Sequence, residues 1–150
     1  MSDIRWMIYG ANGYTGRLVA EVALRRGHRP VLAGRSPDAI IPMAEQLGLE
    51  YAVFQLDDVN TIAEATADLD LFYHAAGPFI YTSDPVVRAC LATGTHYLDI
   101  AGEIPVLANT LTYDDAARSN GVALVSGAGF DVIPTDCLAR YVASQLPSVE

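Results

Sequence analysis

Lysine is absent from this sequence of 150 residues, in which all nine basic residues are arginine. A lysine amine is needed by Walker-type phosphate loops, by Schiff-base enzymes and by the Tyr-x-x-x-Lys pair of short-chain dehydrogenases. The sequence therefore excludes these three chemistries.

Cysteine is scarce, since Cys90 and Cys137 are the only two. They lie far apart, without C-x-x-C spacing and without clustered histidines, which argues against a disulfide framework and against a zinc site. We therefore expect two buried free thiols and no metal centre.

Positive charge and long apolar runs are also scarce. Eighteen acidic residues against nine basic ones give a net charge of −9, which does not favour binding to nucleic acid or to an anionic membrane. The longest uncharged run, residues 71–83, has 13 residues and is too short to span a bilayer. The N-terminus carries no basic region or cleavage site, so we expect a cytoplasmic protein without a transmembrane segment.

Short runs rich in Val, Ile, Tyr and Phe alternate with longer amphipathic stretches. This pattern is typical of β-α units around a parallel sheet that is buried on both faces. The predicted strands are 4–9, 30–33, 51–56, 69–75, 96–100 and 122–126, and the predicted helices are 15–26, 37–47, 61–67, 85–93 and 105–120. The expected fold class is α/β, a Rossmann-type doubly wound sheet of about six strands with helices on both faces.

A last helix is predicted over residues 133–146, with an apolar face. It follows a finished six-strand unit, so it either packs across the edge of the sheet or begins a further domain. We expect a dinucleotide-binding domain over residues 1–129 and the start of a connection over residues 130–150.

Three glycines follow the first strand and open the first helix, as expected of a dinucleotide fingerprint. Gly10 would allow the tight turn, Gly13 the approach of a pyrophosphate to the backbone, and Gly16 the contact of helix with strand. Thr15 could offer its hydroxyl to the pyrophosphate or cap the helix, and Tyr14 could pack over the cofactor or the loop.

The end of the second strand bears on the choice of cofactor. An NAD site places a carboxylate there for the ribose 2′-hydroxyl, but this sequence has Arg35 and Ser36, which suit a 2′-phosphate. NADP(H) is therefore the predicted cofactor. After the third strand, Asp57 or Asp58 could accept a hydrogen bond from the adenine amino group, or either could be an exposed turn residue.

These residues, taken with later ones, resemble the saccharopine dehydrogenase-like family, particularly its bacterial branch of trans-acting enoyl reductases. The resemblance rests on GANGYTG at 10–16, LAGRS at 32–36, AGPF at 76–79, GTHYLDIAGE at 94–103 and GAGFDVIPTD at 127–136. It implies a Rossmann domain that binds NADP(H) through the first loop, Asn12 included. It also implies that Gly77, Pro78 and Phe79 lie near the nicotinamide end.

The same resemblance implies that residues 129–136 lead into a second α/β domain that covers the substrate. Members of the family continue for a further couple of hundred residues, whereas this chain ends at Glu150. We therefore expect the substrate domain to be missing, and the small-molecule substrate to be bound only with its help.

Polar residues at the ends of the last three strands are the candidates for chemistry. Reduction of a carbon–carbon or carbon–nitrogen double bond needs a proton source beside the hydride donor. His74 lies near this edge, and the available acids are Tyr97, Asp99, Glu103 and Asp131. A hydrogen bond within a cap or loop explains each acid at least as well, so the catalytic residues stay open.

The preferred function is the NADP(H)-binding domain of an oxidoreductase that reduces an enoyl or imine-type substrate. One alternative is a non-catalytic module that senses NADP(H) or binds a partner through the last helix. Another is an extended short-chain dehydrogenase or epimerase, against which the lack of lysine counts strongly. Exposed apolar surface would make a homo-oligomer plausible.

Overall fold

One parallel β-sheet organises the computed structural model, which describes residues 4–130 and 132–146. Its strands are β1 Trp6–Tyr9, β2 Val31–Gly34, β3 Tyr51–Val53, β4 Leu71–His74, β5 His96–Asp99 and β6 Leu124–Val125. The helices are α1 Tyr14–Arg25, α2 Pro37–Leu47, α3 Val59–Thr66, α4 Phe79–Thr93, α5 Ile104–Leu111, α6 Asp114–Asn120 and α7 Ile133–Gln145. The strand order β3-β2-β1-β4-β5-β6 confirms the predicted doubly wound fold.

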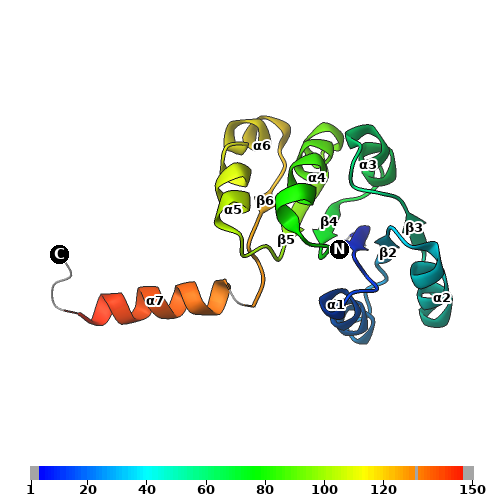
Figure 1. Ribbon diagram of the computed structural model, residues 1–150, viewed down its shortest axis with the longest axis horizontal. Coiled ribbons are helices and arrows are strands. Elements are labelled where there is room, and N and C mark those ends of the chain that lie inside the picture. The colour runs from blue at the N-terminus through cyan, green and yellow to red at the C-terminus, as the bar shows by residue number, and fades with distance from the viewer. Residues whose placement is uncertain (1–3, 131, 147–150) are drawn as a thin grey trace.

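Helices cover both faces of this sheet (Figure 1). α1 and α2 pack on one face beside β1 and β2, and α3 to α6 lie on the other. Because the strands are parallel, all their carboxyl ends meet at one edge. From β1 the chain continues to β2 on one side, and from β4 it continues to β5 on the other side. The switch point of the sheet therefore lies between β1 and β4, and ligands of doubly wound sheets bind at this point.

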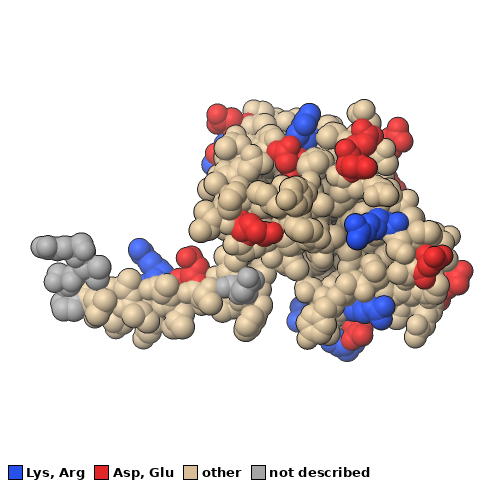
Figure 2. Space-filling view, in the orientation of Figure 1, with Lys and Arg blue, Asp and Glu red and all other residues tan. Residues whose placement is uncertain are grey.

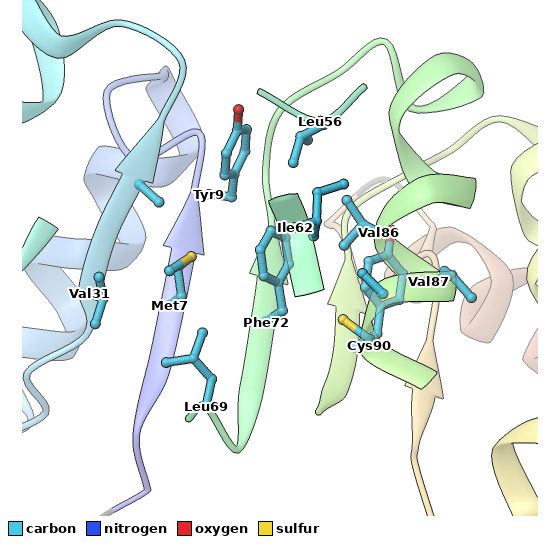
Figure 3. Close-up of a cluster of buried hydrophobic side chains, with 13 residues drawn as sticks. Met7, Tyr9, Val31, Leu56, Ile62, Leu69, Phe72, Val86, Val87 and Cys90 are labelled. Atoms are coloured by element: carbon cyan, nitrogen blue, oxygen red, sulfur yellow. The ribbon is translucent and has the colours of Figure 1, made fainter. Parts of the chain in front are cut away.

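The larger core cluster lies between the sheet and the helices α3 and α4 (Figure 3). Phe72 on β4, Ile62 on α3 and Val86 on α4 are fully buried there. Tyr9 stacks on Phe72 with ring centroids 5.9 Å apart. In Figure 3, Tyr9 and Leu56 close the core at the end toward which β1 runs. The core therefore ends directly beneath the carboxyl edge of the sheet.

Helix α4 starts at Phe79, whereas the sequence predicts a start at Pro85. The prediction relied on the preference of proline for the first position of a helix. Instead Pro78 precedes the helix, and Pro85 lies inside it, where its missing N–H removes one hydrogen bond to the Tyr81 carbonyl. The Thr82 hydroxyl donates to the Pro78 carbonyl at 3.3 Å and supports the added turn.

The helix predicted over residues 105–120 is divided into α5 and α6. Asp84 on α4 accepts hydrogen bonds from the Tyr113 hydroxyl at 2.7 Å and from the Asn109 amide at 2.9 Å. The Thr112 hydroxyl donates to the Asn109 carbonyl at 2.7 Å and ends α5. A long-range contact to α4 therefore interrupts a helix that the local pattern predicts as continuous.

Helix α7 confirms the last predicted helix but buries none of its residues. Figure 1 shows it extending away from the sheet. Its large apolar side chains are all at least half exposed, namely Ile133, Leu138, Tyr141 and Val142, and so is Leu146 directly after it. Of the two alternatives for this helix, packing across the edge of the sheet is not what the structure shows.

The two cysteines differ in their surroundings. Cys90 on α4 is buried as predicted, and burial raises the pKa of its thiol to about 12. Cys137 is exposed, so the expectation that it is buried was wrong, because no described residue covers its side of α7. Among the described residues, no group of three or more metal-ligating side chains comes together.

The surface carries charges of both signs. On the face shown in Figure 2, arginines and acidic residues alternate, and no continuous basic patch forms there. In residues 4–130 and 132–146, every helix is too short or too polar to cross a membrane.

Replacing Tyr113 by Phe tests why α5 and α6 separate. The variant loses the hydrogen bond to Asp84, which keeps Asn109 as a donor. We expect the free energy of unfolding to fall by about 1 kcal/mol in urea denaturation. Tyr141→Phe, on the exposed α7, serves as the control. Equal stability of the two variants would contradict the role given to Tyr113.

Candidate functional site

A cleft of about 850 Å³ opens at the carboxyl edge of the sheet, beside β1, β2 and β4. Seven of the predicted cofactor residues line it, namely Gly10, Asn12, Gly13, Arg35, Ser36, Asp57 and Gly77. Eight further residues line it that the sequence did not single out, namely Tyr9, Gln55, Leu56, Ala75, Ala76, Tyr81, Thr82 and Pro85. The cleft lies at the switch point, as expected for this topology.

The glycine loop brings α1 very close to the end of β1. Gly10 has φ of +85°, and its N–H donates to the Ala33 carbonyl of β2 at 2.8 Å. A Cβ on Gly16 would lie 2.2 Å from the Gly10 carbonyl oxygen, so only glycine allows this approach. The predicted geometric roles of Gly10 in the turn and of Gly16 in the helix contact are therefore visible in the structure.

The first turn of α1 directly follows the glycine loop and begins at the cleft. Gly13 is the N-cap residue and lines the cleft, and no side chain caps the helix. Thr15 lies inside the first turn, so the expectation that it could cap the helix was wrong. Tyr14 is 84% exposed, and neither Tyr14 nor Thr15 lines the cleft. The unpaired N–H groups of this turn form the natural site for an anion.

Arg35 and Ser36 follow β2 on another side of the same cleft. Arg35 is exposed and forms no ion pair with any described residue. Ser36 is the N-cap residue of α2, but its hydroxyl makes no capping hydrogen bond. Both side chains are therefore available to a ligand.

The two aspartates after β3 have different positions. Asp58 caps α3 by accepting from the Thr61 backbone N–H at 2.8 Å and from the Thr61 hydroxyl at 2.7 Å. These bonds, the hydroxyl first, hold the pKa of Asp58 below its usual range, and the cap explains why α3 starts two residues before the predicted Thr61. Asp57 lines the cleft, so the adenine role, if either carries it, falls to Asp57.

Tyr9 forms part of the cleft although its strand position marks it as a core residue. Its hydroxyl donates to the Phe54 carbonyl at 2.7 Å, and burial raises its pKa to about 12. Tyr81 and Thr82 also line the cleft, and they were missed because the sequence predicts the start of α4 at Pro85 instead of Phe79. Correct placement of that helix would have brought them to the edge of the sheet.

Of the Gly77-Pro78-Phe79 stretch, only Gly77 lines the cleft. The Phe79 ring turns inward and lies edge-on to His74, with ring centroids 5.0 Å apart. The Phe79 N–H donates to Glu103 Oε1 at 3.2 Å. Glu103 therefore holds the start of α4, as a structural carboxylate at a helix N-terminus.

Two of the catalytic candidates are buried in one hydrogen-bond network. Asp99 is fully buried and accepts from the Tyr97 hydroxyl, the Ser126 hydroxyl and the backbone N–H groups of Ala101 and Gly127, all within 3.0 Å. Tyr97 is 1% exposed, and burial raises its pKa. These contacts favour the structural alternative for both residues.

The remaining candidate, Asp131, lies outside the described residues, and its catalytic role stays a prediction.

His74 ends β4 at the base of this network. The ring is fully buried, and Nδ1 lies 3.1 Å from the Tyr97 hydroxyl oxygen. Burial lowers the pKa of His74 to about 4, although the charge of Asp99 acts in the opposite direction. The ring is therefore neutral at pH 7. Its Nε2 makes no hydrogen bond within the described part of the chain.

The fold and the cleft together define a Rossmann-type dinucleotide-binding domain. Residues 6–125 match the model of the saccharopine dehydrogenase NADP-binding domain family, and the chain belongs to that family. It is 30% identical over 144 residues to a trans-acting enoyl reductase of Mycobacterium ulcerans, covering 91% of this chain and 34% of the relative. It is 28% identical over 160 residues to a saccharopine dehydrogenase-like oxidoreductase of Bos taurus, covering 93% and 37%.

A solved structure with the same fold is the apo saccharopine dehydrogenase (L-Glu forming) of Saccharomyces cerevisiae. It superposes with a TM-score of 0.79 at 16% identity, covering 95% of this chain and 31% of that one. The chain thus spans about a third of the length of the curated relatives cited above. The predicted resemblance is confirmed, and the predicted domain boundary at residue 129 stays a prediction.

Replacing Gly16 by Ala tests the close approach of α1 to β1. The added Cβ would collide with the Gly10 carbonyl, whereas a Cβ on Gly77 would meet only ordinary contacts from 3.5 Å. We expect Gly16→Ala to lower the free energy of unfolding by about 2–3 kcal/mol and Gly77→Ala to change it little. Urea denaturation of both variants provides the measurement. A Gly16→Ala chain as stable as the wild type would show that the helix can move away.

Acid titration tests the burial of neutral His74. Below its ordinary pKa of 6.5 the histidine of the unfolded chain binds a proton, while the folded ring stays neutral down to about 4. Stability is therefore lost as the pH falls from 6.5 to 4, by about 3 kcal/mol from this residue. His74→Phe lacks this contribution, so its unfolding free energy should fall less across that range. Parallel curves for the two proteins would refute the assignment.

Proposed function

We propose that this chain binds NADP(H) in the cleft at the switch point of its sheet. The N-terminus of α1, with Gly10 and Gly13 at the loop, would hold the pyrophosphate. Arg35 and Ser36 would hold the 2′-phosphate, and Asp57 would meet the adenine. The observation that carries the proposal is one cleft with a glycine cradle on one side and this arginine–serine pair on another.

The residues present fit such a group in shape and in charge. A Cβ on Gly10 would lie 2.8 Å from the Ala75 carbonyl oxygen, so only glycine lets the loop pack this closely against the residues after β4, and Gly10 itself lines the cleft. The residues after β2 provide a guanidinium and a hydroxyl where an NAD site would carry a carboxylate. An anion with an additional phosphate is therefore favoured over one with a free 2′-hydroxyl.

The chemistry follows from the same proposal and from the family. A bound nicotinamide supplies or accepts a hydride. The described residues of this chain bind and orient the dinucleotide, and the core network below β4 keeps the cleft in shape. We propose an enoyl or imine-type double bond as the acceptor, and the name of one relative, a trans-acting enoyl reductase, supports the enoyl type.

The substrate would be bound with polypeptide outside this chain. The relatives are about three times as long, and the exposed apolar side of α7 offers a surface for further packing. The same apolar side also favours the alternative of a module that binds a partner, or a second copy of itself. Both stay proposals.

Calorimetric titration of the chain with NADPH and NADH at one salt concentration tests the cofactor. We expect NADPH to bind more tightly. Arg35→Ala should weaken NADPH binding by about 1–3 kcal/mol and leave NADH nearly unchanged, because it removes a charge-assisted contact to the 2′-phosphate.

Arg25→Ala is the matched control, since it removes the same charge at the far end of α1, where Arg25 pairs only weakly with Glu21 at 3.9 Å. It should change neither affinity. Equal losses for both cofactors in Arg35→Ala would refute the role of Arg35, and binding of neither cofactor by the wild type would refute the proposed function.

A further inference from the structure

A chain of hydrogen bonds runs from Asp99 through Tyr97 to His74. Asp99 Oδ2 accepts from the Tyr97 hydroxyl at 2.8 Å, and the Tyr97 oxygen lies 3.1 Å from His74 Nδ1. All three side chains are at most 1% exposed. Water therefore cannot replace any of these hydrogen-bond partners unless the core opens.

The protons along this chain can be assigned from the inventory of donors. A carboxylate only accepts, and a tyrosine hydroxyl has one proton, so Tyr97 donates to Asp99. Its oxygen then has only lone pairs for His74, and the single N–H of the neutral ring must be at Nδ1. We propose that Asp99 and Tyr97 are positioning residues that hold His74 in the Nδ1–H tautomer beneath the cleft.

The other nitrogen of the ring provides an independent observation. Nε2 is buried and makes no hydrogen bond among the described residues, a state that costs free energy. Nδ1 therefore has a hydrogen-bond partner in Tyr97, whereas Nε2 has none among the described residues.

The tautomer affects the cleft because His74 directly precedes the lining residues Ala75, Ala76 and Gly77. The Ala76 carbonyl accepts from the Thr82 hydroxyl of α4 at 3.2 Å, and Thr82 also lines the cleft. A proton on Nε2 would have no acceptor among the described residues, so the backbone next to the ring would have to shift to provide one. The Nδ1–H form leaves the loop where the structure places it. Only the link from this loop to cofactor affinity rests on the proposed function.

Nitrogen NMR of the histidine rings in Asp99→Asn tests the proposal without a cofactor. Oδ1 of Asp99 accepts from two backbone N–H groups, so the new amide nitrogen faces Tyr97. It would donate to the Tyr97 oxygen, the tyrosine proton would turn to His74 Nδ1, and the ring proton would move to Nε2. We expect this change of tautomer, together with shifted backbone amide signals of residues 75–77.

Two further variants distinguish the effect of the hydrogen-bond chain from Asp99 to His74 from a general loss of structure. Tyr97→Phe removes the acceptor for Nδ1–H and should also give the Nε2–H form, even if Asp99→Asn folds poorly. Ser126→Ala removes a different donor to Asp99 and should leave His74 in the Nδ1–H form. His74→Phe assigns the signals against those of the exposed His28 and His96. An Nδ1–H ring in both Asp99→Asn and Tyr97→Phe, or a change in Ser126→Ala, would overturn the proposal.

Titration with NADPH and NADH then measures the effect on the cleft. Asp99→Asn and Tyr97→Phe should weaken both cofactors equally, by about threefold to tenfold, because the loop lies in the part of the site that they share. Unchanged affinity together with unshifted signals of residues 75–77 would refute the positioning role. A wild type that binds neither cofactor would refute the proposed function. The ring and amide spectra would still show whether Asp99 and Tyr97 set the tautomer of His74.

Discussion

The contact between two stretches of backbone at the start of α1 is the constraint on which the site depends. Gly16 lies over the Gly10 carbonyl so closely that no side chain fits between them. This contact sets the height of α1 above β1 and turns its N-terminus toward the cleft. The position of the proposed anion site therefore follows from backbone packing, with little contribution from side chains.

Buried carboxylates hold the rest of the carboxyl edge. Asp99 joins the ends of β5 and β6 through four donors and reaches β4 through Tyr97. Glu103 holds the first residue of α4 by its backbone N–H. Loops that would otherwise move independently are thus tied to one core, as precise binding of a flexible dinucleotide requires. Asp99 and Glu103, two of the catalytic candidates from the sequence, thus make structural contacts at this edge, and their catalytic roles stay predictions.

The family assignment and the structure complement each other. The match to the saccharopine dehydrogenase NADP-binding domain family covers residues 6–125, which include the glycine loop and the arginine after β2. The family match does not identify the substrate-binding residues, since the chain spans about a third of its relatives' length. Helix α7, which buries nothing, is the part of this chain most suited to contact further polypeptide.

The sequence by itself determined the fold class, the order of the elements and much of the cleft. Strands that are buried on both faces are apolar throughout, so they appear in the sequence as short apolar runs. The glycines and Arg35 directly follow β1 and β2, so their positions can also be recognised from neighbouring residues. Tertiary structure alone decided the start of α4, the break between α5 and α6, and the burial of Tyr97 and Asp99. Each of these depends on a partner distant in the chain, such as Asp84 for Tyr113 or Ser126 for Asp99. A local pattern carries no information about which distant residue will satisfy a hydrogen bond, and only the packed sheet brings such partners together.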